Sequence, residues 1–102
     1  MASMKLHETE KTITKAIREL LRIHNVWHFK VHQGLGSAPG VADIVGIYDG
    51  GRLLAIEVKT SRGRLSPAQE RFLQNVRDRG GLGFVARGVE DVIRELGLKV
   101  LL

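Results

Sequence analysis

Residues 53–59 read Leu-Leu-Ala-Ile-Glu-Val-Lys, a β-strand pattern that carries two charged side chains. Because successive side chains of a strand point to opposite faces, Glu57 and Lys59 share one face and stand about 6.7 Å apart. A glutamate in so apolar a strand is costly unless a partner offsets its charge. Lys59 could be that partner, so this strand alone is equally consistent with a simple salt bridge.

The preceding segment predicts a hairpin that brings a second carboxylate, Asp43, beside Glu57. Residues 49–51 (Asp-Gly-Gly) favour a tight turn. If all three form the turn, Tyr48 pairs with Arg52, and Asp43 lies opposite Glu57 at roughly 5 Å. Two carboxylates this close repel unless one is protonated or a cation lies between them, and Mg²⁺ prefers such oxygen ligands. A two-residue turn would instead place the acids on opposite faces.

The remaining patterns predict a small α/β domain. Outward from the hairpin we expect a helix over residues 9–22, strands over 26–32, 41–48 and 53–59, a helix from Pro67 to Gly80-Gly81, a strand over 83–86, a helix over 89–96 and one more possible strand over 98–102. This order predicts a mixed central sheet flanked by helices. We expect Trp27 and Phe29 in the core. The glycine-rich residues 34–40 either line a DNA groove or only turn the chain.

Two further polar residues are candidates for the same site. Glu10 lies on the helix face of Ile13, which directs it toward the sheet, although it could simply begin the helix and favour its positive end. Gln69 lies on the inward face of its helix with Leu73. It is either the capping-box partner of Ser66 or a residue that orients a water or phosphate beside a metal.

Composition favours a nucleic-acid partner. The 102 residues fit one domain, which we assign to residues 4–102 because residues 1–3 resemble a cloning scar. The net charge is +5, with 16 Lys and Arg against 11 Asp and Glu, and this favours a polyanion: DNA, RNA or an anionic membrane. We expect phosphate contacts from Lys30, Arg62, Arg64 and Arg71, the alternative being a solvated basic face.

The sequence excludes cysteine-based sites and argues against a membrane span and a histidine zinc site. The absence of cysteine excludes disulfides and thiolate metal sites and suits the cytoplasm. No apolar run approaches the roughly 20 residues of a membrane span. Histidines at 24, 28 and 32 would line one helix face as zinc ligands, but the aromatic alternation around them favours a strand.

Three motifs carry a family resemblance. They are Gly40-Val41-Ala42-Asp43-Ile44, Ile56-Glu57-Val58-Lys59-Thr60 and Gly63-Arg64-Leu65-Ser66-Pro67-Ala68-Gln69. In this order they resemble the VRR-NUC branch of the PD-(D/E)XK nucleases. One departure is Ala42, where the family usually has proline.

The resemblance implies a restriction-endonuclease-like αβββαβ core and a magnesium- or manganese-dependent nuclease. It implies that Asp43, Glu57 and the backbone carbonyl of Val58 hold the metal, with Glu10 acting directly or through water, and that Lys59 positions or polarises the attacking water. Similar stand-alone proteins of viruses and bacteria are homodimers that cut branched DNA, including four-way (Holliday) junctions. The alternatives are a DNA-binding module that does not cut and, less favoured, a metal-free structural dimer.

Overall fold

Seven elements follow one another along the part of the chain that the structure, a computed structural model, describes: residues 8–32 and 38–99. They are α1 (Glu10–Ile23), β1 (His28–Lys30), β2 (Ile44–Tyr48), β3 (Arg52–Val58), α2 (Pro67–Asp78), β4 (Leu82–Ala86) and α3 (Val89–Leu96). This order confirms the predicted α/β class and is that of a restriction-endonuclease-like core with one further helix. The proposed cloning scar and most of the glycine-rich loop lie outside the described residues.

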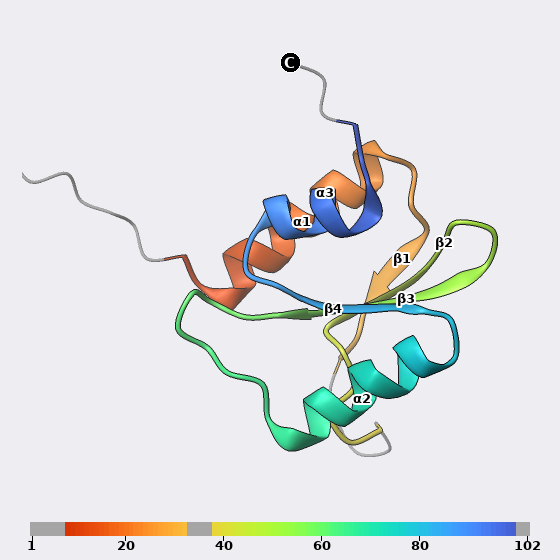
Figure 1. Ribbon diagram of the computed structural model, residues 1–102. Coiled ribbons are helices and arrows are strands. Elements are labelled where there is room, and N and C mark those ends of the chain that lie inside the picture. The colour runs from red at the N-terminus through yellow and green to blue at the C-terminus, as the bar shows by residue number, and fades with distance from the viewer. Residues whose placement is uncertain (1–7, 33–37, 100–102) are drawn as a thin grey trace, which may run out of the picture.

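The four strands form one mixed sheet in the order β1-β2-β3-β4. The first three strands pair antiparallel, and β4 pairs parallel to β3. Helices α1 and α3 cover one face of the sheet and α2 covers the other (Figure 1). Strand β3 is therefore buried on both sides: Ile56 belongs to the core beneath α1 and α3, whereas Ala55 packs against Leu73 of α2.

Local sequence explains where the helices begin. Thr9 and Thr12 form a capping box at the start of α1, in which each side chain bonds the other residue's backbone N–H. Ser66 caps α2 in the same way with Gln69, and Pro67 occupies the first turn, where its missing N–H costs nothing. Gly97 ends α3 in the left-handed conformation.

The hairpin between β2 and β3 has the predicted three-residue turn. Tyr48 pairs with Arg52, and the register continues to Ile44 opposite Ile56. All three turn residues have positive φ, at 50°, 78° and 99° for residues 49 to 51. One step beyond the last pair, the same register places Asp43 and Glu57 opposite each other.

Two sequence-based expectations are wrong, and a third lies mostly outside the described residues. Trp27 and Phe29 are 63% and 45% exposed, not buried, because α2 covers β3 and β4 but leaves their side of β1 and β2 open. Strand β1 has only three residues. Leu98 and Lys99 belong to no strand, and residues 100–102 lie outside the described residues.

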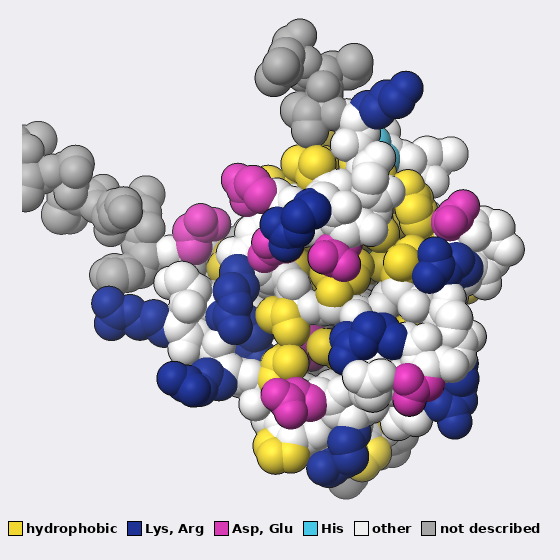
Figure 2. Space-filling model, viewed as in Figure 1, with side chains coloured by type: hydrophobic (Ala, Val, Ile, Leu, Met, Phe, Trp, Pro, Cys, Tyr) yellow, Lys and Arg dark blue, Asp and Glu magenta, His cyan; other side chains and the backbone are white. Residues whose placement is uncertain are grey.

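The described part of the chain has a charged surface and no helix suited to cross a membrane. Side chains of both signs are interspersed over the face that carries α3 (Figure 2). Within residues 8–32 and 38–99, no helix combines the length and apolar character that a bilayer crossing needs.

Candidate active site

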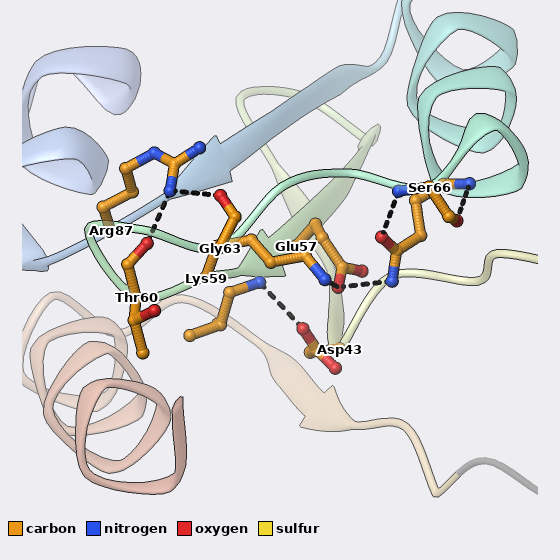
Figure 3. Close-up of polar contacts among 9 residues, drawn as sticks. Asp43, Glu57, Lys59, Thr60, Gly63, Ser66 and Arg87 are labelled. Atoms are coloured by element: carbon orange, nitrogen blue, oxygen red, sulfur yellow. Dashed lines mark hydrogen bonds and ion pairs between the residues drawn. The ribbon is translucent and has the colours of Figure 1, made fainter. Parts of the chain in front are cut away.

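Two carboxylates converge where β2 begins and β3 ends (Figure 3). Asp43 lies just before β2, and its backbone carbonyl accepts a hydrogen bond from Val31 N–H at 2.8 Å. Its side-chain Oδ2 accepts from the backbone N–H of Val58 at 2.8 Å, which fixes the Asp43 carboxylate against the end of β3. Glu57 lies on the same strand end and is only 2% exposed. The hairpin thus holds both acids through backbone contacts.

The two oxygens of Glu57 have different surroundings. Oε2 accepts a hydrogen bond from Gln69 Nε2 at 3.1 Å and lies 3.9 Å from Lys59 Nζ. Oε1 is buried and has no hydrogen-bond partner in the described part of the chain. A buried carboxylate oxygen without a partner is costly, so this atom needs a proton or a cation.

The electrostatics of Glu57 indicate that, without a metal, a proton balances its charge. Burial raises the pKa of Glu57 to about 8, and the hydrogen bonding and negative charge of Asp43 add to the rise. Lys59 lowers this pKa but does not cancel the other causes, and the carboxylate of Glu10 raises it slightly. Without a further cation, Glu57 therefore keeps its proton at neutral pH.

Gln69 is the capping-box partner of Ser66, and its side chain also contacts the buried carboxylate. Its Oε1 accepts from Ser66 N–H at 2.9 Å, completing the helix cap, while its Nε2 donates to Glu57. One side chain thus connects the start of α2 to the buried carboxylate. Gly40 permits this approach, because a Cβ built there would lie 2.3 Å from the backbone of Ala68. The loop before Asp43 and the start of α2 are in direct contact.

Arg87 supports the site, although no sequence motif predicts this role. It follows β4, and its Nη1 donates to the carbonyl oxygens of Thr60 and Gly63, the latter at 2.7 Å (Figure 3). A Cβ at Gly63 would lie only 3.2 Å from the Lys59 side chain. Arg87 therefore holds the loop that packs against Lys59.

The chemistry of the site fits a divalent metal. Asp43 and Glu57 present hard oxygen donors, which Mg²⁺ and Mn²⁺ prefer. Among the described residues Oε1 of Glu57 has no partner, and the raised pKa of Glu57 means that the protein's own cations do not stabilise both carboxylates in their ionised form. Within the described ranges, no group of three or more His, Asp or Glu residues assembles as a ligand set.

Of the other predicted site residues, Glu10 and Lys30 share a hollow with Asp43, whereas the three arginines do not. Glu10 is exposed at the first position of α1 and lines a hollow of about 550 Å³ together with Asp43 and Lys30. Arg62 and Arg64 are exposed in the loop after β3. Arg71 lines a separate hollow on α2 that includes neither carboxylate. Contact of these arginines with DNA remains a prediction.

The histidines are dispersed. His24 caps the C-terminus of α1, whereas His28 begins β1, as the strand interpretation predicted. They contribute to no metal-ligand group in the described part of the chain.

A comparison with protein families agrees with this geometry. The model of the VRR-NUC domain matches residues 6–90. The chain belongs to the VRR-NUC family. The matched range includes the hairpin, Asp43, Glu57, Lys59 and Gln69, and it ends just inside α3. A VRR-NUC domain is a nuclease-type domain, which accounts for the acidic site on a basic protein. No curated protein and no solved structure matches the chain.

Proposed function

We propose that this VRR-NUC protein is a magnesium- or manganese-dependent endonuclease that hydrolyses phosphodiester bonds in branched DNA, such as four-way junctions. The observation that carries the proposal is the buried, partnerless Oε1 of Glu57 beside the carboxylate of Asp43. A site built only for stability would pair or remove such an atom. A metal site needs this oxygen without a protein partner, so that it can bind the metal.

The metal would be held by Asp43, Glu57 and the backbone carbonyl of Val58, with Glu10 acting through water. When bound, a divalent ion supplies a water of lowered pKa and offsets negative charge on the phosphate. Gln69 holds Oε2 of Glu57 and so leaves Oε1 for the metal. Binding would also displace the Glu57 proton, because a metal ligand must be deprotonated.

Lys59 is the residue proposed to orient the attacking water. The Lys59 side chain is 13% exposed, and its ammonium lies beside Glu57 without a close hydrogen bond, since the Nζ–Oε2 distance is 3.9 Å. Its three N–H donors are therefore able to turn toward a water or a phosphate oxygen. A fixed positive charge in a largely buried position acts more strongly there than it would in bulk water.

Branched DNA suits a two-fold dimer, which we propose forms through the open part of the sheet. This surface, the sheet-face patch, consists of the exposed apolar side chains of Trp27, Phe29, Ile47 and Leu53. Register places Phe29 opposite Val45 and Ile47 opposite Leu53, on the α2 side, and the ring of Trp27 lies 5.7 Å from that of Phe29. A closed dimer presents two equivalent sites, one for each of two strands.

The test is cleavage of labelled junction, nicked and linear DNAs with Mg²⁺, Mn²⁺ or chelator. Glu57→Gln and Asp43→Asn should each lower the rate by at least about 10²-fold, because each removes a ligand charge. Glu70→Gln removes an exposed acid from α2 and should leave the rate unchanged.

Two results would contradict the proposal. Undiminished cleavage by Glu57→Gln would mean that the site lies elsewhere. DNA binding without any cleavage by the wild-type protein would identify a binding module that keeps the nuclease fold.

A further inference from the structure

We propose that a basic groove beside α1 holds the sugar–phosphate backbone of a DNA duplex arm and leads it to the carboxylate of Asp43. The basic groove is the hollow of about 550 Å³ between α1, β1 and the start of β2. Its basic lining residues are Lys11, Lys15, Arg18, Arg22 and Lys30. The inference rests on the proposed function, because it identifies the path of that enzyme's substrate.

The four basic residues on α1 form a stripe along one side of the helix. They are spaced four, three and four residues apart, which places them on one face. Ile13 and Ile17 lie on another face, in the core. The stripe spans roughly 16 Å at 1.5 Å per residue. One strand of duplex DNA carries a phosphate about every 3.4 Å of axis, so several consecutive phosphates come within reach.

One of these cations is held in place by the neighbouring strand. Arg18 Nε donates to His28 Nε2 at 3.4 Å, while His28 Nδ1 lies 2.9 Å from the carbonyl oxygen of Val26. This arrangement requires a neutral ring with the proton on Nδ1, so that Nε2 can accept. Arg18 is thus fixed between α1 and β1. Arg22, in contrast, pairs with the exposed Glu19, an interaction worth little in water.

The groove is lined by basic side chains along most of its length and by two acids at one end. This arrangement favours DNA as the occupant, because DNA supplies both phosphates to bind and a phosphate to cut. Glu10 and Asp43 line the same hollow as the basic residues. A phosphate backbone would bind the cations directly but would be repelled by the acids unless a metal ion lay between. In the proposed enzyme, Asp43 would hold such a metal together with Glu57. The groove therefore binds the flanking phosphates, and the acidic end receives the phosphate to be cut.

The salt dependence of DNA binding distinguishes a groove that contacts phosphates from non-specific attraction by the net positive charge. We would measure the affinity of a fluorescein-labelled linear duplex by anisotropy in EDTA, over a series of salt concentrations. For Lys11→Gln/Lys15→Gln, the slope of log affinity against log salt should fall by about 1–2, because each phosphate contact contributes about 0.9. Lys11→Arg/Lys15→Arg should keep the wild-type slope.

A matched control removes the same charge from another surface. Arg94→Gln/Lys99→Gln changes two exposed residues in and after α3, on the face where both signs are interspersed (Figure 2). Its slope should remain that of the wild type. Equal losses in the two double variants would overturn the groove, since net charge would then explain both.

A second variant and a second readout separate this inference from the proposed function. Lys30→Gln, on β1, should lower the slope by about 1 if the groove is continuous between α1 and β1. An unchanged slope in both Lys30→Gln and the α1 variant would refute the groove even if Mg²⁺-dependent cleavage is present. If no DNA is cut, the nuclease proposal fails, while the salt slopes still decide whether the groove binds phosphates.

Discussion

At the scale of single residues, Glu57 combines deep burial with a raised pKa, and this makes stability depend on pH. Its pKa is about 8 in the folded protein against 4.5 for the free side chain. Between these pH values the folded state holds a proton that the unfolded state has released. The free energy of unfolding should therefore fall as pH rises from about 4.5 to 8, by a few kcal/mol at most, and then level off.

The measurement is urea unfolding in EDTA at several pH values. Glu57→Gln cannot ionise, so its stability should lack this decline and should exceed that of the wild type at pH 8.5. Adding Mg²⁺ at pH 8.5 should stabilise the wild type but not the variant, because a ligand bound only to the folded state adds to its stability. Parallel pH profiles for the two proteins would show that Glu57 ionises normally.

At the scale of elements, the active site depends on the contact between the loop before β2 and the start of α2. Gly40 has φ +69°, and a Cβ there would lie 2.3 Å from Ala68. Gly50 also has a positive φ of +78°, but a Cβ there would meet nothing within 4 Å. Gly40→Ala therefore adds a backbone clash to the strain of about 1–3 kcal/mol that both substitutions introduce.

We expect Gly40→Ala to lower the free energy of unfolding by at least about 1 kcal/mol more than Gly50→Ala, measured by urea unfolding. Cleavage should fall as well, because moving the start of α2 moves Gln69 away from Glu57. Gly50→Ala should cut DNA normally. Equal losses of stability and activity in the two variants would show that the loop does not need this close approach.

At the scale of the whole molecule, the sheet-face patch predicts the oligomeric state. We expect the wild-type protein to sediment as a dimer at micromolar concentration. Ile47→Glu places a charge within the patch and should weaken association by at least about 2 kcal/mol, roughly 30-fold in the dissociation constant.

The control for this prediction is Ile23→Glu. Ile23 is 71% exposed, but it ends α1 and does not belong to the sheet face. This variant should remain dimeric. A wild-type protein that stays monomeric in analytical ultracentrifugation, with and without DNA, would refute the dimer.

Much of the fold and part of the candidate site were predictable from local chemistry. The Asp-Gly-Gly turn set the hairpin register, because these residues accept the positive φ that a three-residue turn needs. That register was enough to place Asp43 near Glu57. The spacing of Lys11, Lys15, Arg18 and Arg22 predicts a basic helix face, but only the folded structure places that face beside Asp43 and Lys30.

The amino-acid sequence by itself determined the order of the elements, the hairpin register and the residue types available for chemistry, because turns, caps and side-chain alternation act over a few residues. Only the tertiary structure decided that Trp27 and Phe29 are exposed, since alternation defines two faces of a strand but not which one a helix covers. It also decided that Gln69 reaches Glu57 and that Arg87 holds the loop after β3. These contacts join residues 12 to 27 positions apart, and their geometry depends on how α2 and β4 pack against the sheet.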